Sequence, residues 1–367
     1  MGKIALGLMS GTSADGLSMA LVEFTGSKPS IKAYSTRAYS KKLREKILDA
    51  RSFRAPEIAR LDFELGRFYA REALRFLKDR RVSPKRLTAV GTHGQTIAHA
   101  TGWRFDYTLQ IGEPSYLAEA LGVPVVSDFR PRDIAAGGLG APIIPFFDEV
   151  VYGGGAPRIL QNIGGIANCS FVGKDVPTIG FDTGPGNCLI DLAVRRMSDG
   201  AMAFDRGGRI ARRGNVDEKF VKTLIVRERF FRKRPPKSLD RSSFSGAFLA
   251  QHFRRGTMSD TDVIATVTHF TAATIADAIR RFVIPVAAPK EMIVSGGGAF
   301  NDTLMLTLRR LLYPLPIRSI AATGIPVLAK EPVAIALMAL RAVERKINHC
   351  PRATGASGKR ILGKITI

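Results

Sequence analysis

Three glycine-rich segments combine a backbone that can turn sharply with side chains that can bind phosphate, and each follows an apolar run. They are MSGTSADG (Met9–Gly16), DTGPGN (Asp182–Asn187) and SGGGAFND (Ser295–Asp302). Glycine lets backbone N–H groups approach a ligand closely, and the hydroxyl groups of Ser10, Thr12 and Ser13 supply further donors. We therefore predict that the first segment is an anion cradle for phosphate oxygens. Any one of the three alone is also consistent with a tight turn that binds nothing.

Asp182 is the candidate general base, because the sequence places it at the end of a predicted strand beside glycine N–H groups. A carboxylate in that position can face a bound hydroxyl group or water molecule while a magnesium-bound triphosphate lies across the other turns. None of the three segments fits the P-loop pattern GxxxxGK[ST] or the dinucleotide fingerprint GxGxxG. The pattern favours phosphoryl transfer and does not support those two nucleotide-binding folds.

Polar residues suited to a sugar are concentrated between the first two glycine segments. They occur in THGQTIAH, LQIGEP and SDFRPRDIAAGGLGAP and include His93, Gln95, Thr96, Gln110, Glu113, Asp128, Arg130, Arg132 and Asp133. Planar groups that form two hydrogen bonds at once are typical of such sites, and an arginine would suit a carboxylate on the ligand. His93 is equally consistent with a hydrogen-bonded core histidine. The histidines without metal-ligand spacing, which we predict to be structural, are His99, His252, His269 and His349.

The elements that must position these residues alternate between strands and helices. Apolar runs in LTAVGTHG and VPVVSDF flank the helical pattern of EPSYLAEALG, which predicts an α/β fold with partly parallel sheets. The segment RLDFELGRFYAREALRFLKDRR carries apolar residues at steps of three and four, which predicts an amphipathic helix. Its predicted buried face consists of Leu61, Leu65, Tyr69, Ala73 and Phe76.

Two shorter patterns add to this organisation. Asn301 or Asp302 is expected to cap a helix over NDTLMLTLRRLL. Residues 7–11 and 180–184 share the form Gly, apolar, any residue, Ser or Thr, Gly. That echo predicts duplicated halves that each offer one glycine turn to a shared cleft.

Length and composition indicate the class of protein. A chain of 367 residues and 39.8 kDa is predicted to form two domains. A hydrophobic content of 45% with 24% charged residues indicates a soluble globular protein. No membrane span and no signal sequence are recognisable, so we expect a cytoplasmic protein. Cys169, Cys188 and Cys350 match no zinc or CxxC spacing and are predicted to be buried thiols in a reducing compartment.

The net charge is unusual, since 55 Lys and Arg residues against 32 Asp and Glu give +23. Such a potential attracts polyanions. The densest stretch, VRERFFRKRPPKSLDR, interleaves basic residues with Phe230 and Phe231, as some nucleic-acid-binding surfaces do. Because basic residues are spread along most of the chain, we expect a solvated basic face and no nucleic-acid partner.

Short motifs extend in order along nearly the whole chain: MSGTSADG, THGQT, LQIGE, DFRPRDIA-GG-GAP, LQNIGGIAN, GFDTGPGN, PPKS, VSGGG-N and TGAS. In this order they closely resemble the anhydro-N-acetylmuramic acid kinase family, which belongs with sugar kinases, actin and the Hsp70 chaperones. The resemblance implies a two-lobed actin-like/Hsp70-like sugar kinase fold, with duplicated mixed sheets, flanking helices and a central cleft. It also implies a homodimer. Within one chain, residues 1–133 plus 350–367 are expected to form one lobe and residues 134–349 the other.

The activity that this resemblance implies requires ATP and Mg²⁺. Such an enzyme opens the 1,6-anhydro ring of 1,6-anhydro-N-acetylmuramic acid and phosphorylates the 6-oxygen, giving N-acetylmuramic acid 6-phosphate and ADP in murein recycling. By the family's mechanism, Asp182 would take a proton from the water that attacks the anomeric carbon, as in an inverting glycosidase. The departing 6-oxygen would capture the γ-phosphoryl group.

The family's site residues carry over position by position, and none is assigned to metal. The triphosphate would be bound by Ser10, Gly11, Thr12, Ser13, Ala14, Asp15 and Gly16, with Gly184 and Gly186 on its other side, and Gly296, Gly297 and Gly298 would lie near the adenosine. The sugar would be faced by His93, Thr96, Arg132 and Glu331. Arg132 would be the partner of the lactyl carboxylate.

Some positions depart from the family's pattern. Ser18 stands where the family usually has Asp, Asp240 and Ser242 replace a Gly and a Glu after PPKS, and Leu328 opens the segment that the family writes DAKEA. Because Asp182 and the glycine turns are intact, we expect an active enzyme. Two alternatives remain: a kinase for another anhydrosugar such as levoglucosan, which lacks the N-acetyl and lactyl groups, and a non-catalytic nucleotide-dependent binding module.

Overall fold

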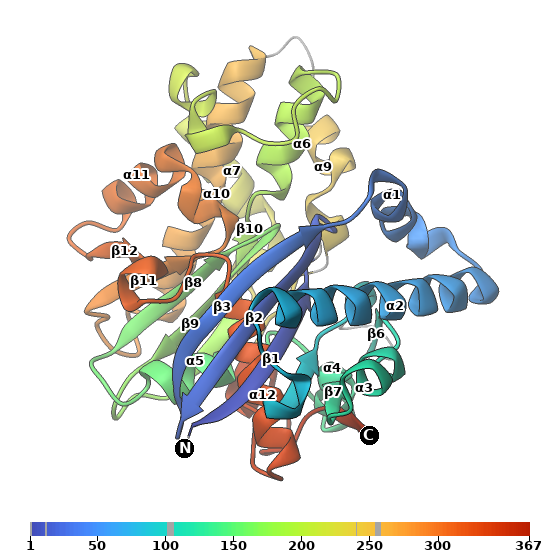
Figure 1. The fold of residues 1–367 in the computed structure, drawn as a ribbon. Coiled ribbons are helices and arrows are strands. Elements are labelled where there is room, and N and C mark those ends of the chain that lie inside the picture. Colours follow the sequence, from blue (N-terminus) through green and yellow to red (C-terminus); the bar gives the residue numbers. More distant parts are fainter. Residues whose placement is uncertain (1, 12, 101–105, 240, 254–257) are drawn as a thin grey trace. The chain divides into compact units, whose positions relative to one another are not determined.

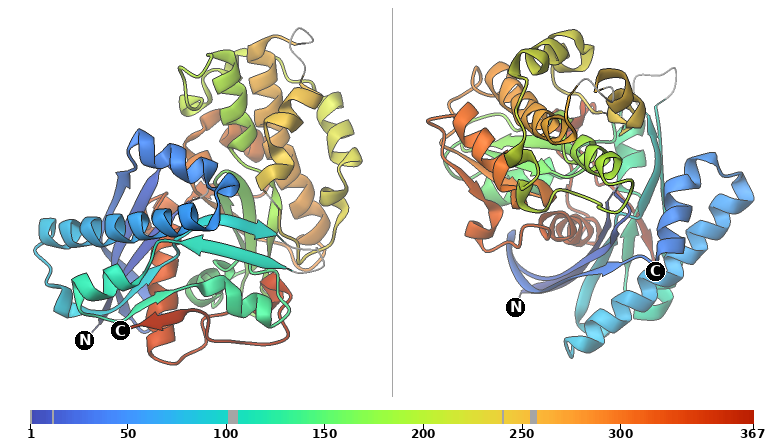
Figure 2. Two further views of the ribbon diagram at one scale, coloured as in Figure 1. Left: turned by 90° about the vertical axis from the view of Figure 1, so that its right-hand side faces the viewer. Right: turned by 90° about the horizontal axis from the view of Figure 1, so that it is seen from above.

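The computed structural model describes residues 2–11, 13–100, 106–239, 241–253 and 258–367 (Figures 1 and 2). Thr12, one of the predicted phosphate-binding residues, lies outside the described residues. The chain divides into two compact units, which we call unit 1 (Met1–Val151 with Leu328–Ile367) and unit 2 (Tyr152–Val327).

Unit 1 is built on a six-stranded mixed sheet in the order β13-β7-β4-β1-β2-β3. Its strands are β1 (Lys3–Ser10), β2 (Gly16–Thr25), β3 (Lys28–Ala38), β4 (Leu87–Thr92), β7 (Val125–Ser127) and β13 (Lys364–Thr366), and β5 (Gln95–Ala100) and β6 (Tyr107–Ile111) form a separate hairpin. The helices are α1 (Lys41–Asp49), α2 (Ala55–Asp79), α3 (Ser115–Leu121), α4 (Phe129–Ala135), α5 (Pro145–Tyr152), α12 (Lys330–Val343) and α13 (Pro351–Thr354).

Helices α2 and α12 pack on opposite faces of the unit 1 sheet. Leu6 and Leu8 of β1 belong to the same core as the buried face of α2, which contains all five apolar residues predicted for it. The intervening Gly7 faces α12 instead, because successive side chains of a strand point to opposite faces. A Cβ atom at Gly7 would overlap the carbonyl oxygen of Pro332, so glycine is what lets α12 lie directly on the strand.

Unit 2 is built on a five-stranded mixed sheet in the order β10-β9-β8-β11-β12. Its strands are β8 (Arg158–Ile163), β9 (Ile166–Val172), β10 (Ile179–Pro185), β11 (Glu291–Ser295) and β12 (Ile317–Ser319). Its helices are α6 (Cys188–Met197), α7 (Glu218–Arg227), α8 (Arg229–Arg232), α9 (Gly246–His252), α10 (Asp260–Phe282) and α11 (Asp302–Leu311). Asn301, not Asp302, caps α11, since its side chain accepts a hydrogen bond from the N–H of Leu304.

The two sheets confirm the predicted α/β class and the predicted duplication. In each, an antiparallel three-stranded meander (β1-β2-β3 or β8-β9-β10) is followed by two strands that run parallel to its first strand. The short echo between residues 7–11 and 180–184 does not follow this duplication. It joins β1 to β10, whereas the topological counterpart of β1 is β8, so the echo is a coincidence of strand sequence.

The unit boundaries differ from those expected from the family resemblance. Residues 134–151 and 328–349 were expected in the second lobe but belong to unit 1. The physical reason is burial: α12 is apolar on nearly every side, and its place against β1 and β4 covers it.

Of the three cysteines, Cys169 and Cys350 are buried and Cys188 is only half-buried. Within the described part of the chain, no helix has the length and apolarity to cross a membrane.

Candidate active site

Buried hydrogen bonds fix Ser10, the residue at which β1 ends and the turn to β2 begins. The hydroxyl of Ser10 donates to Oε1 of Gln95 at 2.6 Å and accepts from the hydroxyl of Tyr39 at 2.8 Å. Burial raises the pKa of Tyr39 to about 12, so its hydroxyl stays a donor at neutral pH. The Ser10 side chain is thus engaged within the protein.

The glycines of this turn differ in what surrounds them. A Cβ atom at Gly11 would find only Oγ of Ser13, at 3.9 Å, among the described residues within 4 Å. At Gly16 it would overlap the carbonyl oxygen of Arg37, so that glycine is required by the pairing of β2 with β3. Ala14 adopts a left-handed conformation with φ of 53°, and Asp15 forms an ion pair with Arg44 at 3.2 Å. Gly11 is therefore the residue beside which a ligand has room.

Unit 2 has a turn in the topologically equivalent place, between β8 and β9. It contains Gly164 and Gly165, whose carbonyl oxygens accept hydrogen bonds from the N–H groups of Asn187 (2.8 Å) and Gly186 (2.9 Å). A Cβ atom at Gly186 would overlap the carbonyl oxygen of Gly164. The DTGPGN segment thus supports this second turn.

The third glycine segment joins the same group. Nδ2 of Asn187 donates to the carbonyl oxygen of Ile163 at 3.3 Å. Cβ atoms at Gly296 or Gly298 would come too close to Ile163. Gly297 is exposed, and among the described residues a Cβ atom there would contact only Nδ2 of Asn187, at 3.4 Å. In unit 2, the Gly164–Gly165 turn, the DTGPGN segment and the SGGG segment therefore converge. Gly297 is the accessible glycine of SGGG.

Gly184 is enclosed by protein. It has φ of 150°, and a Cβ atom there would lie 2.8 Å from the hydroxyl oxygen of Thr274 and 3.0 Å from the ring of Phe231. The β10 ladder has a bulge between Asp182 and Gly184, and the strand runs on to Pro185. The expectation that Asp182 lies at a strand end is therefore corrected: Asp182 lies inside β10, at its bulge.

The carboxylate of Asp182 is fixed by the segment that follows the PP dipeptide. Its backbone N–H donates to the carbonyl oxygen of Lys237 at 3.1 Å. Its Oδ2 accepts hydrogen bonds from the N–H of Leu239 at 2.7 Å and the hydroxyl of Ser238 at 3.3 Å. With 7% of its surface exposed, Asp182 is buried in one orientation. Hydrogen bonds of this kind favour the ionised carboxylate, which is the form that accepts a proton.

In unit 1, the predicted sugar-binding residue His93 is bonded to Arg130. Nε of Arg130 donates to Nε2 of His93 at 3.0 Å, and Nδ1 of His93 lies 3.1 Å from the carbonyl oxygen of Gly94. Burial, reinforced by the positive charge of Arg130, lowers the pKa of His93 to about 3. His93 is therefore a neutral imidazole with its proton on Nδ1. It orients Arg130 and cannot exchange protons near neutral pH.

Glu331 lies in the same cluster. Burial raises the pKa of its carboxyl group, and the charges of Lys330 and Arg130 oppose that rise. The neighbouring Lys330 is buried and forms an ion pair with Asp148 at 2.8 Å, which fixes the first turn of α12. Thr96, on β5, accepts a hydrogen bond from Gln110 at 3.3 Å.

Arg132 is placed differently. It is exposed, and Nη1 donates to the carbonyl oxygen of Ile361 in the C-terminal segment at 2.8 Å. Arg130 and Arg132 are two residues apart on α4, so they point to different sides of the helix. The structure therefore groups Arg130, and not Arg132, with His93 and Glu331.

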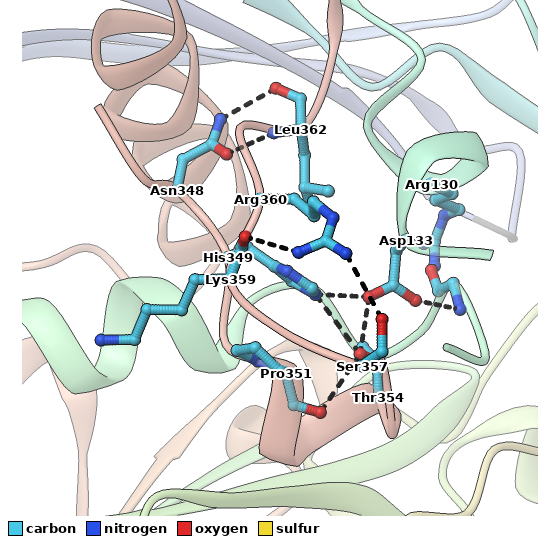
Figure 3. A network of polar contacts seen from close by, with 11 residues as sticks. Arg130, Asp133, Asn348, His349, Pro351, Thr354, Ser357, Lys359, Arg360 and Leu362 are labelled. Carbon is cyan, nitrogen blue, oxygen red and sulfur yellow. Dashed lines mark hydrogen bonds and ion pairs between the residues drawn. The ribbon is translucent and has the colours of Figure 1, made fainter. Parts of the chain in front are cut away.

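A buried polar network supports helix α4, which carries Arg130, and the loop that follows it (Figure 3). Oδ1 of Asp133 lies 2.5 Å from Nε2 of His349 and accepts a hydrogen bond from the hydroxyl of Thr354 at 2.6 Å, and Oδ2 accepts from the N–H of Gly140 at 2.6 Å. The carbonyl oxygen of Gly140 in turn accepts from Nη1 of Arg130 at 2.8 Å. Burial acts to raise the pKa of Asp133, but the hydrogen bonds outweigh it and hold the pKa below its usual value.

The positions that depart from the family pattern have separate surroundings. On β2, the hydroxyl oxygen of Ser18 lies 3.0 Å from that of Thr36 and 3.4 Å from that of Tyr34, both on β3. Leu328 is 44% exposed, and Asp240 lies outside the described residues.

Several residues of the site were not among the predicted site residues. They are Gln95, Arg130, Gly164, Gly165, Asn187 and Lys237. Gln95 and Arg130 stood among the polar residues of the THGQT and DFRPRD segments, and the GG of LQNIGGIAN was a visible glycine turn. The signal that could have selected that turn is the duplication itself, which makes it the counterpart of Met9–Gly16.

Comparison with known proteins agrees over the whole chain. The family model described as anhydro-N-acetylmuramic acid kinase matches residues 3–367. The anhydro-N-acetylmuramic acid kinase of Caldanaerobacter subterraneus subsp. tengcongensis is 35% identical, over 100% of this chain and 97% of that protein. The protein of the same name from Pseudomonas paraeruginosa is 39% identical, over 98% of each chain.

Similarity to solved structures is weaker. The component A of (R)-2-hydroxyglutaryl-CoA dehydratase from Acidaminococcus fermentans matches with a TM-score of 0.48 at 12% identity, over 93% of this chain and 99% of that one. A ROK family glucokinase from Streptomyces griseus, in complex with glucose and AMPPNP, matches with a TM-score of 0.39 at 16% identity, over 92% and 99%. Neither similarity is high enough to bear on activity.

Proposed function

The chain belongs to the anhydro-N-acetylmuramic acid kinase family, and from that membership we propose that it opens the 1,6-anhydro ring of 1,6-anhydro-N-acetylmuramic acid and phosphorylates the 6-oxygen with ATP. The observation that carries the proposal is the arrangement at Asp182. Its buried carboxylate is oriented by Lys237, Ser238 and Leu239, and it lies on the strand that leads into the converging glycine turns of unit 2. Such an arrangement suits one base that activates one water molecule.

In the proposed reaction, Asp182 accepts a proton from the water that attacks the anomeric carbon. The bond between that carbon and the bridging 6-oxygen breaks, and the electron pair stays on this oxygen, which attacks the γ-phosphorus of ATP. One base thus serves both ring opening and transfer. The products are N-acetylmuramic acid 6-phosphate and ADP.

The residues present fit a triphosphate. The turn at Gly11 in unit 1 has space beside it among the described residues, as a phosphate group needs. Among those residues there is no group of three or more His, Cys, Asp or Glu side chains that could hold a metal. Mg²⁺ is commonly held by one or two carboxylates together with phosphates and water, so we propose that it enters with the triphosphate. When bound, it neutralises charge on the β- and γ-phosphates.

Gly11→Val tests the phosphate turn. The branched side chain would occupy the space beside Gly11 that is open among the described residues, so the KM for ATP should rise by roughly ten-fold or more while the midpoint of thermal unfolding changes little. Steady-state kinetics with varied ATP and a thermal scan measure the two quantities. Unchanged ATP kinetics in the folded variant would remove the turn from the nucleotide site.

A matched pair of variants tests which arginine binds the lactyl carboxylate. Arg130→Lys and Arg132→Lys each keep the charge but lose the planar fork of donors. Because Arg130 lies with His93 and Glu331, Arg130→Lys should lower kcat/KM for 1,6-anhydro-N-acetylmuramic acid by roughly ten-fold or more. Its effect on levoglucosan, which has no carboxylate, should be smaller. A larger selective loss in Arg132→Lys would instead return this role to Arg132, as the family resemblance implies.

An ATP-dependent assay with both anhydrosugars, with the product identified by mass spectrometry, tests the function itself. Phosphorylation of levoglucosan alone would favour the first alternative, and no turnover with retained nucleotide binding would favour a binding module. We further propose a cytoplasmic homodimer with no nucleic-acid partner. Sedimentation measures the oligomeric state. A mobility-shift titration across salt tests nucleic-acid binding, since phosphate-driven binding weakens steeply with ionic strength.

A further inference from the structure

Lys237 is a lysine with no exposed surface. Its Nζ lies 4.6 Å from the ring centroid of Phe230, 4.7 Å from that of Phe282 and 5.7 Å from that of Phe181. Its one hydrogen bond among the described residues goes to the carbonyl oxygen of Phe230, at 3.3 Å. The side chain therefore anchors its segment in the aromatic core of unit 2.

The same residue begins the segment that orients Asp182. Its carbonyl oxygen accepts the N–H of Asp182, and the next two residues bond the Asp182 carboxylate through Ser238 Oγ and the Leu239 N–H. Phe181, whose ring contacts the ammonium, directly precedes Asp182 on β10. Anchor and carboxylate are thus connected through two short stretches of backbone.

The buried positive charge of Lys237 lowers the stability of the fold at neutral pH. Burial lowers its pKa to about 8, against the opposing fields of Cys169 on β9, Asp277 on α10 and Asp182 on β10, while Arg281 on α10 adds to the lowering. Because this pKa lies below that of the unfolded chain, the buried charge costs stability at neutral pH and the cost is relieved as pH rises above about 8. A hydrocarbon of the same shape would anchor the segment as well or better.

What the charge does provide is a positive field at Asp182, since the two groups interact electrostatically. A positive neighbour favours the ionised form of a carboxylate. We propose that Lys237 is a positioning residue for Asp182, in which the buried stem fixes the 237–239 segment that orients the carboxylate and the ammonium favours its proton-accepting form. The inference rests on the proposed function only in taking Asp182 as the base.

Two substitutions separate the stem from the charge. Lys237→Met keeps the stem and removes the charge, so the pKa of Asp182 should rise, because a positive neighbour favours the ionised carboxylate. The acid limb of kcat/KM should move upward by the same amount, with the midpoint of thermal unfolding unchanged or raised. Lys237→Ala removes both, and its turnover should also fall by roughly ten-fold or more at the pH optimum.

The pKa of Asp182 is measured without substrate, by NMR titration of protein labelled at the aspartate carboxyl carbons, with Asp182→Asn assigning the signal. Lys233→Met, an exposed lysine of the same basic stretch, is the matched control and should change neither pKa nor turnover. If the wild-type protein fails to phosphorylate the sugar, the proposed function fails, yet the NMR shift still tests Lys237. An unchanged Asp182 pKa in Lys237→Met overturns the electrostatic part. Full turnover in folded Lys237→Ala overturns the positioning part.

Discussion

Asp182→Asn is expected to lower the turnover of 1,6-anhydro-N-acetylmuramic acid by roughly 10²–10⁴-fold, the range typical of losing a general base. The amide oxygen of Asn can still accept the hydrogen bonds from Leu239 and Ser238, so the fold and nucleotide binding should survive. The amide cannot accept the proton from water. Because ring opening and phosphorylation share this base, no opened, unphosphorylated sugar should accumulate.

Product analysis by mass spectrometry and an independent measurement of ATP binding distinguish loss of chemistry from loss of structure. Asp175→Asn is a matched control in the same unit, since Asp175 is exposed and its φ of 63° is one that Asn tolerates. Its turnover should be that of the wild type. If Asp182→Asn keeps more than about a tenth of wild-type turnover, well short of the expected loss, the base lies elsewhere and the proposed mechanism is wrong.

Asp133→Asn is expected to lower the free energy of unfolding by about 3 kcal/mol or more, the cost of breaking a buried charged network at one partner. The fully buried carboxylate of Asp133 accepts hydrogen bonds from His349, Thr354 and Gly140. In the variant, one of the two acceptor oxygens would be replaced by an NH₂ group, which would face one of these donors. Urea unfolding measures the change. Because Gly140 also holds Arg130, the KM for the sugar should rise.

Asp128→Asn is the matched control, since it removes an exposed ion pair with Lys364 at 2.8 Å at the start of the same helix. An exposed pair contributes about 0–1 kcal/mol. The pH dependence gives a second test. The folded pKa of Asp133 lies below the usual 3.8, so its contribution is present above that value and is lost as pH falls through the folded pKa. Asp133→Asn should lack this part of the acid destabilisation, and equal effects of both variants would remove the special role of the network.

Local sequence was sufficient for the features that depend on neighbours along the chain. The three- and four-residue spacing of apolar residues in Ala55–Asp79 places them on one stripe of a helix whatever it packs against, and this prediction is confirmed. The glycine turn after β1 and the α/β alternation were likewise predicted and are present. The motif order also identified the family, which the whole-chain match confirms.

Selection among similar residues needed the tertiary structure. Arg130 and Arg132 are equivalent by type and by motif, but they lie on different sides of α4, and only contact with His93 and Gly140 selects between them. Glycines that face open space cannot be told locally from those that other strands enclose, as the contrast between Gly11 and Gly16 shows. The burial of Lys237 among three phenylalanines is decided by residues 45–56 positions away along the chain as well as by near neighbours. Spacing along the chain determines the local conformation of a turn or a helix, whereas packing between distant segments decides which of its residues are enclosed and which stay accessible.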